Sequence, residues 1–269
     1  MKIFCLSIFN ENFDLFKKFN LIPVGLGKVN FDKKWLNDKG EINITDKNEN
    51  FGEYTFHYHL WKNNLIDQNY NSWIGFCTYR RLWANTNQNK PISFNSLERS
   101  IIKEPRKDWL NYDVVLAKPL IFNKINNMKL IKKNLFQVIK KPSVLIKKTS
   151  LLDQFNIFHG SYFLKEALSL LKKEDRDDFL QYLKGYELNP HNMFICRNYQ
   201  ILNKFYEEIF PWLFKCEKIF KTKKLIGYEK IRIYGFLAER YMPYWFKKNF
   251  KTIEWPIIFF DTHQNNRNE

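Results

Sequence analysis

Cysteine, glycine and proline are all scarce in this sequence. Its 269 residues include four cysteines, nine glycines and nine prolines. The cysteines, at 5, 77, 196 and 216, form no Cys-x-x-Cys pair and no Cys/His cluster with metal-ligand spacing. This scatter argues against a structural zinc site and predicts reduced thiols in a cytoplasmic protein. Because no Gly/Ser/Pro-rich linker divides the chain, a single domain spanning 1–269 is expected.

Long apolar runs are missing as well. The longest, at 3–9 and 255–260, are far shorter than the roughly 18 residues that a membrane-spanning helix needs, which excludes an integral membrane protein. The N-terminal segment begins like a signal peptide, with one lysine and a short apolar run. Polar and acidic residues then follow where a small-residue cleavage site would lie. The segment is therefore predicted to be a first buried strand.

Aromatic and basic residues, by contrast, are abundant. The chain has 26 Phe, 14 Tyr and 8 Trp, which predicts an aromatic-rich folded core. It also has 44 Lys and Arg against 28 Asp and Glu, a net charge of +16, which favours phosphate-bearing partners: nucleic acid, nucleotides or anionic lipid. Coding bias of an A/T-rich genome is the alternative source of this excess, since Lys, Asn, Ile and Phe are enriched together.

The order of apolar patterns predicts an α/β fold with a mixed central sheet flanked by helices and a helical C-terminal half. Strands are expected at 2–9, 73–77, 113–117 and 191–196, and helices at 51–63, 199–220 and 230–248. Two further helices are expected in the stretch that begins at 151. Pro142 and Pro211 are expected to interrupt the pattern locally.

Several familiar site motifs are absent. Neither GxxxxGK[ST] nor GxGxxG occurs, and GxSxG is missing too, which removes support for kinase, ATPase, dehydrogenase and serine-hydrolase functions.

The acidic string at 175–178 has the composition of a metal-chelating pair, but its charged helical setting favours a solvated helix face. His57 and His59 point to different faces of a helix, so structural roles are favoured over a metal site.

The most informative segment is 73–83, where an apolar strand ends and presents Thr78, Tyr79, Arg80 and Arg81. Ligands of open α/β sheets bind beyond the carboxyl ends of strands. Two adjacent arginines there can grip a diphosphate bidentately and neutralise a leaving group without a metal ion. A surface ion pair is the alternative. His191, in a turn that leads into the predicted strand at 191–196, is a second candidate for ligand contact.

Five segments taken together, at 23–31, 35–63, 74–81, 191–197 and 235–245, carry a family resemblance. The first helix is preceded by a match to N-I-S-x-x-N-P-x-x-x-E-L-T, made by Asn43, Ile44, Thr45, Asn48, Glu53 and Thr55, with Glu49 in place of Pro. The strand end matches G-x-C-H-Y-R-R, with Thr78 in place of His. The chain resembles the bacterial galactofuranosyltransferases of capsule and O-antigen loci, formerly a domain of unknown function.

This resemblance implies a GT-A-like fold that transfers galactofuranose, or a related furanose, from a UDP-sugar to a growing capsular or lipopolysaccharide glycan, with inversion. By position, the cationic strand end replaces the metal-binding DxD of GT-A enzymes, so no metal cofactor is expected. Glu239 is the first candidate for the base, with His191 and Glu53 as reserves, and helix anchoring or pairing with Arg240 is the alternative role of Glu239. The donor site is expected to comprise Thr78, Tyr79, Arg80, Arg81, Asn43, Asn48, Asn192 and Arg240.

Within the single domain, 1–125 is expected to bind the nucleotide sugar, 126–190 to form a helical insertion and 191–260 to face the acceptor. The segments 132–148 and 245–251 mix basic and apolar residues, which predicts peripheral association with the anionic cytoplasmic face of the inner membrane, where lipid-linked acceptors lie. Two alternatives remain open. One is a catalytically silent subunit that binds sugar nucleotides, and the other is a nucleic-acid-binding protein, although no RNP, zinc-finger or helix-turn-helix signature is present.

Overall fold

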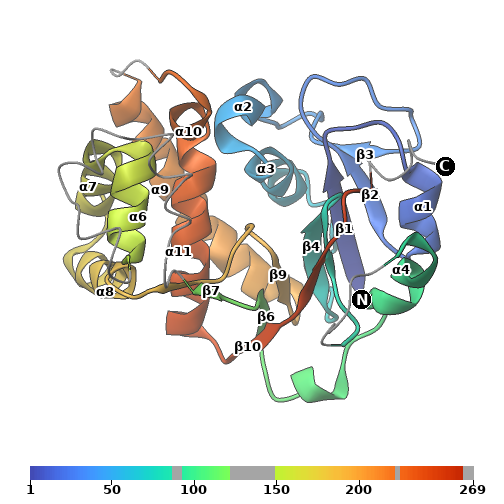
Figure 1. Ribbon diagram of the computed structural model, residues 1–269. Helices are drawn as coiled ribbons and strands as arrows, with labels where there is room; N and C mark the ends of the chain where they lie inside the picture. Colours follow the sequence, from blue (N-terminus) through green and yellow to red (C-terminus); the bar gives the residue numbers. More distant parts are fainter. Residues whose placement is uncertain (87–92, 122–148, 222–224, 263–269) are drawn as a thin grey trace.

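A mixed β-sheet forms the centre of the molecule in the computed structural model, which describes residues 1–86, 93–121, 149–221 and 225–262 (Figure 1). The strands of its main path run in the order β10-β6-β9-β4-β1-β2-β3, and β5 pairs with both β4 and β11. Their bounds are β1 Lys2–Ser7, β2 Ile22–Gly25, β3 Leu36–Asn37, β4 Ile74–Thr78, β5 Arg81–Trp83, β6 Val114–Ala117, β9 Phe194–Cys196, β10 Thr252–Trp255 and β11 Ile257–Phe259. A separate small sheet joins β7 Leu120–Ile121 and β8 Glu187–Leu188.

Strand direction determines which chain segments meet at one edge of the sheet. β1 pairs in parallel with β2 and with β4, whereas β9 lies antiparallel between β4 and β6. The carboxyl ends of β1, β2 and β4 therefore meet at the same edge as the segment that enters β9. This edge brings the segment after Thr78 close to the turn at His191.

The central strands β1, β4, β6 and β9 are buried on both faces, as their continuous apolar runs predict. In β1, Phe4 and Leu6 belong to one apolar cluster, whereas Ile3 and Cys5 belong to the other. The same alternation holds in β6, whose four residues are all buried. Two apolar layers therefore hold the sheet between them.

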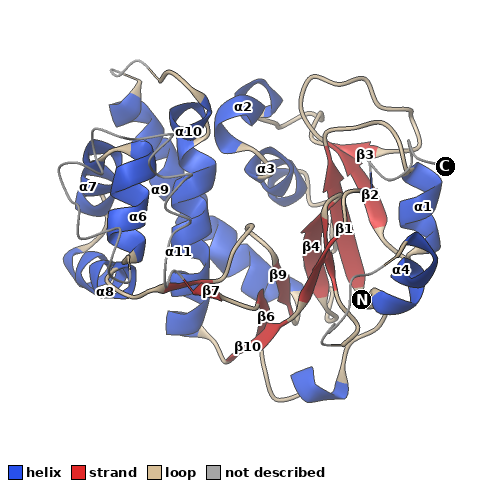
Figure 2. Ribbon diagram, viewed as in Figure 1, coloured by secondary structure: helices blue, strands red, loops and turns tan. Residues whose placement is uncertain are grey.

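Helices cover the two faces unequally (Figure 2). The larger layer contains η1 Thr45–Lys47, α2 Asn48–Phe51, α3 Tyr54–Lys62, α9 Tyr199–Phe220, α10 Tyr228–Ile231 and α11 Ile233–Asn249. On the opposite face lie α1 Phe13–Lys18, α4 Phe94–Ser100 and η2 Lys107–Trp109. No helix among the described residues is long and apolar enough to cross a membrane.

Three helices, not the expected two, follow residue 150: α6 Leu151–His159, α7 Ser161–Ser169 and α8 Lys173–Leu183. Gly160 separates the first two, because its φ of 92° and ψ of 144° lie outside the helical region. Pro211 was expected to interrupt its segment, yet α9 continues through it. A proline inside a helix costs about 3 kcal/mol, which the buried side chains of Ile209, Phe210, Trp212 and Leu213 offset.

Other predicted elements have different bounds or are divided. The helix expected at 51–63 is divided into α2 and α3 at Gly52, which has a φ of 59°. The strand expected at 191–196 begins only at Phe194, because His191 and Asn192 adopt left-handed conformations with φ of 74° and 51°. Of the insertion expected at 126–190, residues 126–148 lie outside the described residues.

Candidate active site

A cavity of about 460 Å³ lies at the edge of the sheet where the parallel strands end. One side, here called the strand wall, comprises Leu6, Ile8, Leu26, Thr78, Tyr79, Arg80 and Arg81. The opposite side, the helix wall, comprises Asn48, Gly52, Glu53, Tyr228, Arg232, Gly235, Phe236 and Glu239. His191 and Asn192 complete the lining from the turn before β9.

The strand wall carries two arginines on a tight connection between β4 and β5, where Thr78 pairs with Arg81. The backbone N–H of Phe260 donates to the carbonyl oxygen of Arg80 over 3.0 Å, which fixes the course of the connection. Within the part of the chain that the structure describes, the Nε atoms of both arginines and Oγ1 of Thr78 are buried without a hydrogen-bond partner. Buried polar atoms are normally paired, but the Nε atom of Arg240 is also buried without a partner, so it is the position of Arg80 and Arg81 on the cavity that indicates a ligand site.

Positive charge concentrates on this wall. Burial lowers the pKa of Arg81, and the nearby Arg80 lowers it further, whereas Glu239 and Glu53 act in the opposite direction. An arginine side chain stays protonated at physiological pH despite such a shift. The wall therefore presents two fixed cations to the cavity.

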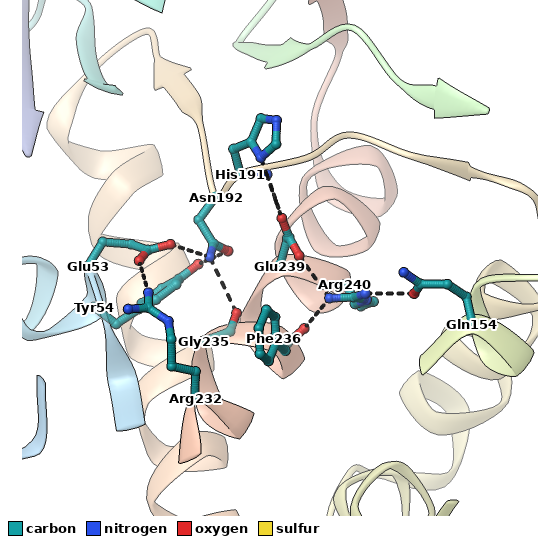
Figure 3. Close-up of polar contacts among 10 residues, drawn as sticks. All are labelled: Glu53, Tyr54, Gln154, His191, Asn192, Arg232, Gly235, Phe236, Glu239 and Arg240. Atoms are coloured by element: carbon teal, nitrogen blue, oxygen red, sulfur yellow. Dashed lines mark hydrogen bonds and ion pairs between the residues drawn. The ribbon is translucent and has the colours of Figure 1, made fainter. Parts of the chain in front are cut away.

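Glu239 is held from two sides on the helix wall (Figure 3). Its Oε1 accepts the backbone N–H of His191 at 2.7 Å, and its Oε2 accepts Nη1 of Arg240 at 2.8 Å. Arg240 is only 3% exposed and also donates to the carbonyl oxygen of Phe236 and to Oε1 of Gln154, at 3.2 and 2.7 Å. These contacts on both carboxylate oxygens fix the position of the Glu239 side chain.

Glu53 is the second carboxylate of the helix wall and has partners of its own. It accepts Nδ2 of Asn192 at 2.6 Å and Nη2 of Arg232 at 3.0 Å, as Figure 3 shows. The hydroxyl of Tyr54 donates to Oδ1 of Asn192 over 3.2 Å, which fixes the amide orientation. Gly52 makes room for this pair, since a Cβ atom there would lie 2.3 Å from Nη2 of Arg232.

His191 lies between the two walls. Its Nδ1 is 4.0 Å from Oε1 of Glu239. Burial and the positive charges of Arg81 and Arg80 lower the pKa of His191 to about 3, so the imidazole is neutral at physiological pH. The left-handed conformations of His191 and Asn192 are uncommon outside glycine, and strained backbone of this kind clusters at functional sites.

Nine of the eleven residues predicted for the site line this cavity: Glu53, Thr78, Tyr79, Arg80, Arg81, His191, Asn192, Glu239 and Asn48. The other two do not. Asn43 is exposed and caps a local turn, donating to the carbonyl oxygen of Gly40 at 2.6 Å and accepting the N–H of Thr45 at 3.1 Å. Arg240 lies buried behind Glu239, and its guanidinium donates to Glu239, Phe236 and Gln154. The amide of Asn48 lines the cavity, yet it donates to the carbonyl oxygen of Gly52 and to Oγ1 of Thr55, both at 3.0 Å.

Sequence reasoning missed three side chains of the helix wall: Tyr228, Arg232 and Phe236. They recur every four residues and continue toward Glu239, which is the spacing of one helix face. This spacing is the sequence signal from which the three side chains could have been predicted to share one face with Glu239. The predicted helix at 230–248 also excluded Tyr228, because α10 is a short helix that follows Gly227.

The remaining polar motifs have structural partners. Asp175 and Asp178 lie on α8 and accept Nζ of Lys248 at 3.0 and 2.6 Å, which confirms the expected charged helix face. His57 is fully buried, with Nδ1 at 2.7 Å from the hydroxyl of Tyr206, and His59 contacts Asn63. Among the described residues, no three His, Cys, Asp or Glu side chains form a group suited to a metal ion.

The fold is shared with a known glycosyltransferase. The apo structure of the bifunctional glycosyltransferase WbbM superposes with a TM-score of 0.71 at 16% sequence identity. The match covers 97% of this chain and 45% of WbbM, so the chain spans less than half the length of that protein. This likeness confirms the predicted GT-A-like α/β fold. No curated protein sequence matches the chain at a significant level.

One family match covers most of the sequence. Residues 6–250 match the family described as a domain of unknown function, DUF4422. The matched region contains every residue that lines the cavity. The chain therefore belongs to the DUF4422 family.

Proposed function

We propose that this chain is a glycosyltransferase that moves a sugar from a nucleotide diphosphate to a glycan acceptor. One observation carries the proposal: Arg80 and Arg81, whose Nε atoms are buried without a hydrogen-bond partner, line a cavity whose opposite wall holds an oriented carboxylate, Glu239. Cations suit the leaving diphosphate, and a carboxylate suits the acceptor hydroxyl. The shared fold with a glycosyltransferase supports the same reading.

For the donor, we propose UDP-galactofuranose or a related furanose nucleotide, on the strength of the motifs at 43–55 and 75–81. The diphosphate accepts hydrogen bonds from Arg80 and Arg81, whose fixed charges stabilise the negative charge that develops on departure. Thr78 contributes its buried Oγ1. Transfer without a divalent metal follows, because the strand end presents cations where a metal site would need carboxylates.

For the reaction, Glu239 is the proposed base. The acceptor hydroxyl loses its proton to Glu239 as its oxygen forms a bond to the anomeric carbon. The bond from that carbon to the diphosphate oxygen breaks on the opposite side, and the electron pair leaves with UDP. This displacement inverts the anomeric configuration. His191 and Glu53 are the reserve candidates, and Asn192 lies where an amide can contact a sugar hydroxyl.

The test is a transfer assay on the purified full chain. A panel of furanose and pyranose UDP-sugars is incubated with lipid-linked and soluble glycan acceptors, and UDP release and product are followed with and without EDTA. We expect acceptor-dependent transfer from a furanose donor, inverted product by NMR, and full activity in EDTA. Donor binding without turnover on any acceptor would contradict the proposal and favour a silent binding subunit, whereas salt-dependent retention of RNA would favour a nucleic-acid partner.

We also propose peripheral association with an anionic membrane surface. The net charge of +16 supports it. Of the two segments expected to make contact, 132–148 lies outside the described residues. In 245–251, Trp245 and Phe246 are buried in the core, and Lys247 pairs with Glu254 at 3.0 Å, so the apolar part of this segment is not available to lipid. Equal partitioning onto neutral and anionic vesicles at low salt would contradict the proposal.

A further inference from the structure

One face of α10 and α11 continues along the cavity beyond Glu239. Tyr228, Arg232, Phe236 and Glu239 follow one another at spacings of three and four residues, and all line the cavity. Phe236 lies about one helical turn before Glu239, and the ring of Tyr228 lies beyond Phe236, with ring centroids 6.0 Å apart. The cavity wall therefore extends well past the proposed reaction centre.

Tyr228 lies at the far end of this face and is unusually accessible for an aromatic residue of this protein. It is 63% exposed, although it lines the cavity. Its ring meets that of Phe236 edge-on, with centroids 6.0 Å apart, and the guanidinium carbon of Arg232 is 5.8 Å from its centroid. Arg232 is in turn held by Glu53. These contacts hold an exposed ring beside Phe236 and Arg232 on the helix wall.

We propose that Tyr228 is a stacking platform for the acceptor glycan, and that it binds a sugar unit further along the acceptor than the one that carries the attacking hydroxyl. This inference rests on the proposed function. The apolar C–H face of a sugar ring packs on an aromatic ring, whose face is electron-rich. A nucleotide sugar is small enough to stay within the cavity, whereas a growing glycan must leave it across an exposed edge.

The order of side chains along the wall determines which sugar unit reaches the ring. The attacking hydroxyl belongs beside Glu239, and Phe236 lies about one helical turn before Glu239. The ring of Tyr228 lies beyond Phe236, with ring centroids 6.0 Å apart. The sugar that presents its hydroxyl to Glu239 therefore lies beside Phe236, and Tyr228 is left to a further unit, which only an oligosaccharide acceptor supplies.

The experiment measures saccharide binding by saturation-transfer NMR in the presence of saturating UDP. The probes are one-, two- and three-unit oligomers of galactose, glucose and N-acetylglucosamine. We expect wild-type protein to bind a trisaccharide at least ten-fold more tightly than its monosaccharide. Tyr228→Ala should lose that gain, whereas Tyr228→Trp should keep it. Tyr186→Ala is the matched control, because Tyr186 is 41% exposed and is not among the residues that line the cavity.

UDP affinity, measured by calorimetry on the same proteins, separates the two proposals. If wild-type protein binds UDP but shows no preference for longer saccharides, the platform is wrong and the proposed function stands. If Tyr228→Ala lowers UDP affinity and leaves saccharide binding unchanged, the ring serves the nucleotide and the platform is again wrong. If wild-type protein binds neither UDP nor any saccharide, both proposals fail. Because Tyr228 is mostly exposed, its replacement should leave the protein folded.

Discussion

The two walls of the cavity carry charge in different ways. On the strand wall, among the described residues, the Nε atoms of Arg80 and Arg81 are buried without hydrogen-bond partners. On the helix wall, Glu239 is already paired with Arg240 at 2.8 Å. Cations with unpaired buried donors have a desolvation cost that a bound anion relieves, whereas a carboxylate paired with a buried guanidinium is held in position before any ligand arrives. The strand wall is therefore suited to binding and the helix wall to proton transfer.

The two arginine–carboxylate pairs of the helix wall differ from each other too. The Arg240 side chain is 3% exposed, whereas that of Arg232 is 28% exposed and lines the cavity. A buried counter-ion stays in place when substrate binds, but a partly exposed one can exchange its carboxylate for a ligand. This difference favours Glu239 over Glu53 as the carboxylate whose position is fixed for chemistry.

The largest expected effect comes from the helix wall. Glu239→Gln keeps shape and removes basicity, so transfer should fall by about 100-fold or more while UDP-sugar binding is retained. Glu53→Gln is the matched variant, and its transfer rate should fall less than about ten-fold. Rates come from UDP release, and binding from calorimetry.

Folding is the control for this pair of variants. If Glu239 only anchors α11 or pairs with Arg240, Glu239→Gln should melt earlier and lose transfer in proportion to its folded fraction. A stable Glu239→Gln protein with near-normal turnover would move the base to His191 or Glu53. His191→Ala would then be the next variant to assay.

The strand wall should give the next largest effect. Arg80→Ala or Arg81→Ala removes one preorganised donor to the leaving diphosphate, so turnover should fall by about 100-fold, or roughly 2.7 kcal/mol of transition-state stabilisation. Arg176→Ala is the control, because Arg176 pairs with Asp177 on α8 and is not among the residues that line this cavity. Unchanged turnover in both cavity variants would contradict this role and favour the alternative of a surface ion pair.

The contrast between the walls was only partly predictable from the sequence. Arg80 and Arg81 could be predicted because the end of an apolar run marks the carboxyl end of a buried strand. Charged residues directly after that end must lie at the edge of the sheet. Glu239, His191 and Glu53 were also placed at the site, on the family resemblance and on residue chemistry. What local sequence cannot give is their pairing, since Glu239 meets His191 across 48 residues of chain.

The differences between the predicted and the observed positions have physical causes of the same kind. Asn43 satisfies its amide in a local turn, a frequent alternative for asparagine that motif matching does not detect. Arg240 was predicted for the donor site, but it does not line the cavity, and its Nη2 donates to Gln154 on α6. The left-handed turn at His191 carries no glycine, so propensity predicts extended strand there.

His191, between the walls, should make stability depend on pH. Its pKa is about 3 in the folded protein and near 6.5 when unfolded, so the unfolded state binds the proton more readily between those values. Stability should therefore fall as pH drops from about 7 toward 3, by about 2 kcal/mol at pH 5 for this residue. Urea unfolding at pH 7.5 and at pH 5 measures this difference in the free energy of unfolding. His191→Asn, which tolerates the left-handed backbone, should lose about that much of the pH dependence, and an unchanged pH dependence would contradict the assigned shift.

The smallest expected effect tests how Arg232 is seated beside Glu53. Gly52→Ala places a methyl group 2.3 Å from Nη2 of Arg232 and also strains a backbone with a φ of 59°. Gly160→Ala is matched for strain, since Gly160 has a φ of 92° and an added Cβ would meet nothing within 4 Å. Both should lose about 1 to 2 kcal/mol of stability from backbone strain, and Gly52→Ala should lose roughly 1 kcal/mol more. Chemical unfolding measures the difference, and saturation-transfer NMR reports whether the displaced Arg232 weakens saccharide binding. Equal stability losses in the two variants, with unchanged saccharide binding, would show that Arg232 can move without cost. The absence of a side chain at Gly52 would then not be needed for the Arg232–Glu53 pair.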